Sequence, residues 1–322
     1  MERLRRPKPP PEGWRACHLL SVDDLTDREI RFVIDLAEYY ADGLRRDAPA
    51  MRRLAGKTQI NLFYEDSTRT NLSFDLAGRK LGADVLNVPV AASSVNKGEA
   101  LIDTAQTLAA MGARIMIVRH PEPGVHRALA ERLPCPVVNA GDGVGEHPTQ
   151  ALLDATSIRA AFGTVAGLTI AICGDIKHSR VAGSNARLLH RLGADIRFVG
   201  PAHLMPDPEL FPDIGRFDSL EAGLANADVA IALRMQFERM HGEDEADAAA
   251  RGYFDTFGLS HETISYGKPG LRVMHPGPMN RGVEIDGALA DDPSRSLVLD
   301  QVFYGVATRM AILDAFMTGG AL

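Results

Sequence analysis

The chain of 322 residues lacks long apolar runs and has little cysteine. Its three cysteines, Cys17, Cys135 and Cys173, are odd in number and widely spaced. That pattern excludes a disulfide framework and a cysteine metal-ligand pair, and it favours a reducing compartment, so we expect a cytoplasmic protein. The longest apolar stretches, such as 168–173, fall far below the ~18 residues that a membrane-spanning helix needs.

The chain also has no excess of positive charge. Lysine and arginine total 35 and aspartate and glutamate total 42, which gives a net charge of −7. Nucleic-acid-binding proteins usually show a basic excess, so we expect no nucleic-acid partner and no membrane partner. Apolar residues make up 45% and charged residues 24%, ordinary values that exclude a disordered chain, a collagen-like repeat and a coiled coil.

Residues 1–15 differ from the rest, since they are basic, rich in proline and without the apolar core of a secretory signal. This composition predicts a flexible leader. Trp14, the single tryptophan, is expected to pack onto the domain that follows.

Beyond the leader, short apolar runs alternate with helical patterns. A first helix, capped by Ser21 or Thr26, is predicted to run to about residue 45. We then expect strands at 59–63, 84–88, 114–118 and 136–139, and helices at 70–81, 100–111, 125–133 and 148–162. The pattern restarts with strands at 168–173, 195–199, 227–233 and 271–275, and helices at 181–192 and 303–317. This alternation predicts an α/β protein with two doubly wound parallel-sheet domains of similar size, 16–155 and 156–302.

Three hydroxyls and a guanidinium gather in the turn between the first predicted strand and the next helix. They belong to Ser67, Thr68, Arg69 and Thr70. A helix N-terminus binds phosphate through free backbone N–H groups and its positive dipole end, and arginine can grip a phosphate with two hydrogen bonds. The alternative is a capping cluster beside a surface arginine.

Two further residues stand where ligands bind in open α/β sheets. Arg119 follows a strand, at the end where such sheets place ligands, although a lone arginine there is often only solvated. His147 precedes Pro148 at a helix start, which favours a neutral imidazole that can donate to a developing oxyanion. Gln150 lies on the same helical face. A capping or core histidine is the alternative for His147.

The second half contributes two arginines and a proline-rich turn. Arg180 and Arg234 fall at strand-to-helix loops, and two guanidiniums suit a substrate with two carboxylates. Asp175 and Lys177 form a surface ion pair or support these arginines. No Gly-x-Gly-x-x-Gly follows Cys173, which excludes a dinucleotide fold. The turn 275–278, His-Pro-Gly-Pro, contains two prolines, which lack N–H groups and make the turn rigid, so its backbone carbonyls can face a ligand. The alternative is a purely structural turn.

Seven segments in order resemble the transcarbamoylases, and among them the aspartate carbamoyltransferases, over about residues 17–318. Ser-Thr-Arg-Thr at 67–70 and His-Pro-Thr-Gln at 147–150 carry most of the resemblance. The others are 93–99, 118–121, 175–180, 234–236 and 275–278. The resemblance implies transfer of the carbamoyl group of carbamoyl phosphate to L-aspartate by direct attack, in pyrimidine biosynthesis, with no cofactor and no metal. It also implies that helix 303–318 returns to complete the N-terminal, carbamoyl phosphate-binding domain, with 156–302 as the aspartate-binding domain.

The same resemblance assigns the site residues. Those for carbamoyl phosphate are Ser67, Thr68, Arg69, Thr70, Ser93, Arg119, His147, Gln150, Gly277 and Pro278. Those for aspartate are Lys97, Arg180, Arg234 and Gln236. Arg69, Thr70, Lys97, Arg119 and His147 would be the catalytic residues.

The resemblance further implies a homotrimer in which Ser93 and Lys97 reach the active site of a neighbouring subunit. The leader and residues 279–285 resemble forms that assemble with a dihydroorotase or a dihydroorotase-like chain.

Two alternative functions stay open. Ornithine carbamoyltransferase usually has a His-Cys-Leu-Pro turn, whereas residues 275–278 contain no cysteine. A non-catalytic scaffold subunit of the same fold should have lost charged site residues, but all of them are present in this sequence.

Overall fold

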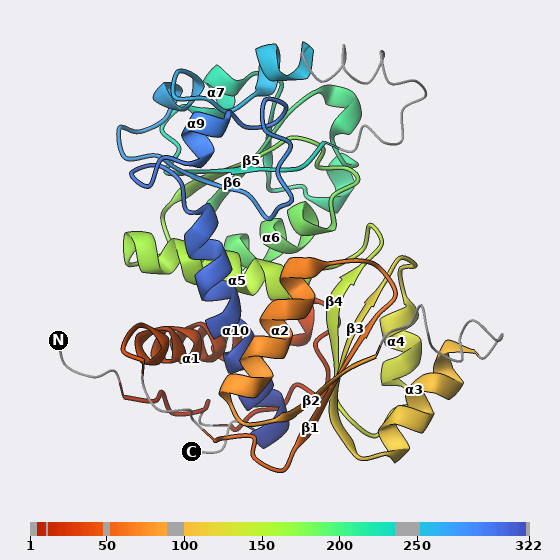
Figure 1. The fold of residues 1–322 in the computed structure, drawn as a ribbon. Coiled ribbons are helices and arrows are strands. Elements are labelled where there is room, and N and C mark those ends of the chain that lie inside the picture. The colour runs from red at the N-terminus through yellow and green to blue at the C-terminus, as the bar shows by residue number, and fades with distance from the viewer. Residues whose placement is uncertain (1–4, 11, 48–51, 89–99, 236–251, 320–322) are drawn as a thin grey trace. The chain divides into compact units, whose positions relative to one another are not determined.

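A computed structural model describes residues 5–10, 12–47, 52–88, 100–235 and 252–319, which form two compact units (Figure 1). Unit 1 consists of Met1–Thr156 with Val302–Leu322, and unit 2 of Ser157–Gln301. None of the helices in these ranges is long and apolar enough to cross a membrane.

Unit 1 is built on a four-stranded parallel sheet, and the four predicted strands are confirmed. The strand order is β2-β1-β3-β4, with bounds Asp84–Val88, Thr58–Phe63, Ala113–His120 and Val137–Asp142. Helices lie on both sides of the sheet (Figure 1). They are α1 Asp27–Arg45, α2 Thr68–Lys80, α3 Leu101–Ala110, α4 Val125–Ala130, α5 Pro148–Phe162, which continues into unit 2, and α10 Val298–Thr318.

The start of α1 is fixed by side chains that the sequence offered as alternatives. Thr26 is the cap of α1 and forms a capping box with Glu29, whereas Ser21 caps a short 3-10 turn, Val22–Asp24. Glu29 is buried and also accepts from the backbone N–H of Arg15 at 2.8 Å and of Ala16 at 3.1 Å. The first residues of the domain are thereby tied to α1.

The expected packing of Trp14 is confirmed. Its ring meets that of Phe316 edge-on, with the centroids 5.0 Å apart, and lies 6.2 Å from the ring of Phe32. The indole therefore joins the start of the chain to both α1 and α10.

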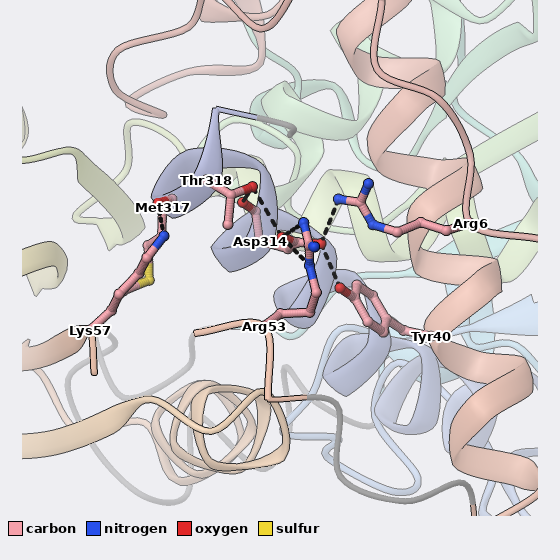
Figure 2. A network of polar contacts seen from close by, with 7 residues as sticks. All are labelled: Arg6, Tyr40, Arg53, Lys57, Asp314, Met317 and Thr318. Atoms are coloured by element: carbon pink, nitrogen blue, oxygen red, sulfur yellow. Dashed lines mark hydrogen bonds and ion pairs between the residues drawn. The ribbon is translucent and has the colours of Figure 1, made fainter. Parts of the chain in front are cut away.

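A buried carboxylate on α10 also gathers distant parts of unit 1, as Figure 2 shows. Asp314 has no exposed surface, and it accepts from the Tyr40 hydroxyl at 2.6 Å and from Arg6 at 2.9 Å. Arg53 adds a longer ion pair of 3.3 Å. Removing the partners of a buried charge costs free energy, so this network holds the C-terminal helix within unit 1.

Helix α10 begins five residues earlier than the predicted start at 303. Leu299 and Val302 are 82% and 49% exposed, so they do not continue the buried stripe from which the start was predicted. The Ser296 hydroxyl accepts from the Val298 N–H at 3.3 Å, and this contact supports the earlier start.

Unit 2 is built on a five-stranded parallel sheet in the order β7-β6-β5-β8-β9. The strand bounds are Gly215–Phe217, Asp195–Val199, Thr169–Cys173, Val229–Ala232 and Arg272–Met274. The edge strand β7 was not predicted, because its three residues are too short for a periodic pattern. The helices with described bounds include α6 Arg180–Arg191, α7 Leu220–Leu224 and α9 Gly287–Ala290, residues 252–257 are also helical, and 3-10 turns lie at Ala202–Leu204, Pro208–Leu210 and Thr263–Tyr266.

Both sheets contain a point at which the order of the strands reverses. In unit 1 the chain proceeds from β1 outward to β2 and then returns to the other side at β3. In unit 2 it proceeds from β5 to β6 and β7 and then returns at β8. In open α/β sheets, ligands bind outside the carboxyl ends of the strands at such a point. The fold therefore marks one candidate position in each unit.

Candidate active site

The turn that follows β1 opens onto the reversal point of unit 1. The first helical hydrogen bond of α2 runs from the Asn71 N–H to the Ser67 carbonyl at 3.0 Å, so the backbone N–H groups of the preceding residues have no acceptor within the helix. Ser67 occupies the cap position, but its hydroxyl makes no capping bond. Thr68 and Arg69 are exposed and Thr70 is buried. Donors and one cation are thus concentrated at a helix N-terminus.

Arg119 lies at the end of β3, immediately beside this turn. It is the register partner of Phe63 at the end of β1, and its carbonyl accepts from the Tyr64 N–H at 2.8 Å. Its side chain is buried, which excludes the alternative of a merely solvated arginine. The guanidinium donates to the Ala140 carbonyl at 3.2 Å and pairs with Glu65. These contacts hold it at the carboxyl edge of the sheet.

A second cation, Arg69, stands in the turn itself. Desolvation lowers the pKa of its guanidinium, which remains protonated at neutral pH because the ordinary value exceeds 12. Arg69 and Arg119 together provide positive charge on two neighbouring strand ends of unit 1.

His147 is placed by a tight loop after β4. The Asp142 carboxylate accepts from the Glu146 N–H at 2.5 Å, and the Gly145 N–H donates to the Asp142 carbonyl at 2.7 Å. A Cβ on Gly145 would lie 2.8 Å from that carboxylate, so a larger residue there would displace the Asp142 side chain. His147 is buried at the start of α5, with Nδ1 3.5 Å from the Thr149 hydroxyl.

Gln150 follows on the first turn of α5 and is also buried. Its side-chain Nε2 donates to Asp154 Oδ1 at 2.9 Å. The structure therefore brings Gln150 into contact with an acidic residue to which the sequence analysis gave no role.

In unit 2, the two predicted arginines flank the reversal point. Arg180 is the first residue of α6, after the β5 loop, and Arg234 lies two residues beyond β8; both are half-buried. Of the two alternatives for Asp175 and Lys177, the ion pair is not formed, and Asp175 makes another contact. The Asp175 carboxylate lies 3.0 Å from His178 Nδ1 and accepts from the His178 N–H at 3.2 Å.

The turn 275–278 follows β9 and is held by a buried histidine. His275 Nδ1 accepts from the Gly277 N–H at 2.8 Å, so Nε2 carries the proton that it shares with Glu284 at 3.0 Å. Glu284 is buried and also accepts from the Asn280 N–H at 2.5 Å. The backbone at Gly277 is left-handed, with a φ of 69°, and the bond to Pro278 is cis. These contacts define the directions of the turn's carbonyls.

Three predicted residues, Ser93, Lys97 and Gln236, lie outside the described residues. Within the described ranges no group of three or more His, Cys, Asp or Glu side chains is arranged to hold a metal ion. Glu65, Asp154 and Glu284 were missed. Asp154 had a signal, since it stands four residues after Gln150 on one helical face. Glu284 had none, because eight residues of irregular chain separate it from His275.

Comparison with known proteins shows the family to which the chain belongs. Residues 17–160 match the family described as aspartate/ornithine carbamoyltransferase, carbamoyl-P binding domain, and residues 166–316 match its Asp/Orn binding domain. An aspartate carbamoyltransferase catalytic subunit from Cereibacter sphaeroides is 53% identical, covering 94% of this chain and 93% of the relative. One from Caulobacter vibrioides is 52% identical, over 92% and 89%.

Solved structures are similar over the same length. Aspartate transcarbamoylase from Trypanosoma cruzi, in complex with N-(phosphonacetyl)-L-aspartic acid, is 31% identical with a TM-score of 0.85, covering 95% of this chain and 97% of that one. The catalytic subunit of M. jannaschii aspartate transcarbamoylase is 33% identical with a TM-score of 0.83, over 94% and 98%. The chain therefore belongs to the aspartate/ornithine carbamoyltransferase family, among the aspartate carbamoyltransferase catalytic subunits.

Proposed function

We propose that this chain transfers the carbamoyl group of carbamoyl phosphate to the α-amine of L-aspartate, giving N-carbamoyl-L-aspartate and phosphate for pyrimidine biosynthesis. The observation that carries the proposal is the pairing, at the reversal point of unit 1, of a helix N-terminus rich in hydroxyls with the buried Arg119. That arrangement suits a phosphate ester or anhydride.

We assign carbamoyl phosphate to one set of residues and aspartate to another. The phosphate group receives hydrogen bonds from Ser67, Thr68, Arg69 and Thr70, with Ser93 contributed by a neighbouring subunit. Arg119 and His147 donate to the carbonyl oxygen, while Gln150 and the carbonyls of Gly277 and Pro278 accept from the amino group. Arg180, Arg234, Gln236 and the neighbour's Lys97 bind the two carboxylates of aspartate, because paired guanidiniums match carboxylate geometry.

The reaction needs no enzyme nucleophile, since carbamoyl phosphate is already an activated mixed anhydride. The aspartate amine attacks the carbamoyl carbon, the C–O bond to phosphate breaks, and a phosphate oxygen takes the proton from the amine. His147, with Arg69, Thr70, Lys97 and Arg119, stabilises the charge that develops on the carbonyl oxygen and the departing phosphate. Holding the two reactants in position supplies roughly 7–11 kcal/mol of the barrier reduction.

We further propose that the active form is a homotrimer with sites shared between subunits. Leu72 and Leu76 are 62% and 43% exposed and lie four residues apart on α2, so they share a helix face. Leu86, on β2, is 50% exposed. Exposed leucines on adjacent elements suit a contact with another copy of the chain. A larger assembly with a dihydroorotase or dihydroorotase-like chain is a separate proposal that rests on the leader and residues 279–285.

We place the protein in the cytoplasm. Cys17, Cys135 and Cys173 are all free, and burial raises the pKa of the Cys173 thiol to about 12. Free thiols suit a reducing compartment.

Product formation tests the proposal. The purified chain is mixed with carbamoyl phosphate and either aspartate or ornithine, and both products and phosphate are measured. Carbamoyl-aspartate with an equal amount of phosphate is expected. Citrulline would overturn the assignment of the second substrate. No product from a folded trimer would instead favour a non-catalytic scaffold subunit.

A further inference from the structure

The carboxylate of Asp154 lies directly behind Gln150 on helix α5. Asp154 has no exposed surface and Gln150 is only 7% exposed. Their contact, 2.9 Å from Gln150 Nε2 to Asp154 Oδ1, is therefore a hydrogen bond to a carboxylate within the protein interior. Hydrogen bonds of this kind are stronger than those between neutral groups.

This contact determines which end of the Gln150 amide faces away from Asp154. An ionised carboxylate can only accept hydrogen bonds, so it must meet the Nε2 end of the amide. The carbonyl oxygen, Oε1, then points the other way and can accept from a ligand. A protonated or amide side chain at position 154 could also donate, and it would permit the reversed orientation of Gln150.

A buried cation, Arg309, interacts electrostatically with Asp154 over a distance, without a direct ion pair. Burial lowers the pKa of Arg309 to about 10, while the charge of Asp154 acts to raise it, so the guanidinium stays protonated at neutral pH. A nearby positive charge in turn favours the ionised form of a carboxyl group.

The position of Arg309 is fixed on two sides. Its Cζ lies 5.0 Å from the ring centroid of Phe74 on α2, and Nη1 donates to the Gly305 carbonyl at 3.3 Å. A Cβ on Gly305 would lie 3.0 Å from Nη1, so the absence of a side chain there leaves room for the guanidinium. Arg309 is thus held between α10 and α2.

We propose that Asp154 is a positioning residue: with Arg309 maintaining its charge, it turns the Gln150 carbonyl toward the amino group of carbamoyl phosphate. Through Gln150 it selects carbamoyl phosphate over acyl phosphates that lack an amino group. This inference rests on the proposed function, which places Gln150 beside that amino group.

The Asp154→Asn variant tests the proposal, since it keeps the shape of the side chain and removes its charge. Calorimetry on the full-length chain measures binding of three probes: carbamoyl phosphate, acetyl phosphate, which has a methyl group in place of the amino group, and inorganic phosphate. We expect up to a roughly tenfold loss of affinity for carbamoyl phosphate alone, the effect of one neutral hydrogen bond. Asp75→Asn, which removes a carboxylate paired with Arg79 on α2, is the matched control and should leave all three affinities unchanged.

The outcomes separate a positioning role from a structural one. If all three affinities of Asp154→Asn fall together, the residue supports the fold of the site, and the proposal is overturned. The proposal also fails if the preference for carbamoyl phosphate over acetyl phosphate stays at the wild-type value. A wild-type chain that binds phosphate but not carbamoyl phosphate would overturn the proposed function itself.

Arg309 variants test the second half of the proposal. Arg309→Lys keeps the charge and should retain the preference for carbamoyl phosphate, whereas Arg309→Met should lose it to the same extent as Asp154→Asn. If Arg309→Met fails to fold because it leaves a buried carboxylate uncompensated, the double variant Asp154→Asn, Arg309→Met removes both charges. The double variant should show the same preference as Asp154→Asn alone. A further loss of preference would contradict the proposal that Arg309 acts through Asp154.

Discussion

The two units use the same topological position but supply charge to it in different ways. In unit 1, the strand ends at the reversal point carry a helix N-terminus, Arg69 and Arg119, and the buried acid Asp154 is matched by the buried cation Arg309. In unit 2, the corresponding loops carry Arg180 and Arg234. There the buried acid Glu284 is matched by His275 and a backbone N–H instead.

The difference follows from what each acid must hold. Asp154 holds one end of a side-chain amide that can rotate, so its charge decides an orientation. Glu284 holds the backbone turn 275–278 through His275 and Asn280, so it acts on shape. Charge at Asp154 should therefore matter for selectivity, and charge at Glu284 for stability.

The largest effect is expected in unit 1, from His147→Ala. Removal of one donor to a developing oxyanion lowers kcat by about 10²–10³. The value is measured at saturating carbamoyl phosphate and aspartate, with the trimer shown to be folded. His190→Ala, an exposed histidine in the last turn of α6, is the control and should keep the wild-type rate. A folded His147→Ala trimer with an unchanged kcat would remove His147 from the mechanism.

The corresponding change in unit 2, Arg234→Ala, should act on binding instead. Loss of a hydrogen-bonded cation from a carboxylate raises the aspartate KM by roughly tenfold to a hundredfold. Inhibition by inorganic phosphate should be unaffected, because phosphate is assigned to unit 1. An aspartate saturation curve identical to that of the wild type would show that the two units do not divide the substrates in this way.

A smaller effect is expected from Glu284→Gln, and on a different property. Glutamine keeps an acceptor for Asn280 and His275 but loses the negative charge, which should cost about 1–2 kcal/mol of unfolding free energy. The loss is measured by urea denaturation. Glu262→Gln, at an exposed position, is the control. If Glu284→Gln unfolds like the wild type yet loses the preference for carbamoyl phosphate, the contrast between the two acids is wrong.

Much of the fold was predictable because the periodic patterns are long. Continuous apolar runs such as Thr169–Cys173 are buried on both faces of a parallel sheet, and they were found at nearly their observed bounds. The edge strand Gly215–Phe217 was missed because three residues carry no period. The early start of α10 was missed because Leu299 is exposed rather than part of the buried stripe.

The site was predictable to the extent that its residues form local motifs. The turn 67–70 and the segment 147–150 each combine residues that are adjacent in sequence, so their proximity needs no tertiary knowledge. Arg309 could not be predicted, since it lies over the ring of Phe74 and within the electric field of Asp154 only through the return of α10 to unit 1. Glu65 and Glu284 were missed for the same reason: their partners, Arg119 at the end of β3 and His275 in the turn after β9, come close to them only in the folded chain.

The smallest effect is expected from Glu29→Gln, because Glu29 is the counterpart of Glu284 in unit 1. Glu29 is a buried carboxylate bound by backbone N–H groups, and Glu29→Gln should cost about 1 kcal/mol at pH 7 as the capping box weakens. Burial acts to raise the pKa of Glu29, but hydrogen bonds from Thr26, Arg15 and Ala16 outweigh it and leave the pKa below its ordinary value.

The lowered pKa of Glu29 determines how the stability difference between the wild type and Glu29→Gln depends on pH. A carboxyl group with a depressed folded-state pKa contributes stability above its unfolded-state pKa of about 4.3, and the contribution is lost as the pH falls through the folded-state value. Urea denaturation at pH 7 and below pH 4 should therefore show a gap between wild type and Glu29→Gln that shrinks in acid. A gap of the same size at both pH values would mean that Glu29 stabilises unit 1 through packing rather than through its charge, unlike the role assigned to Glu284.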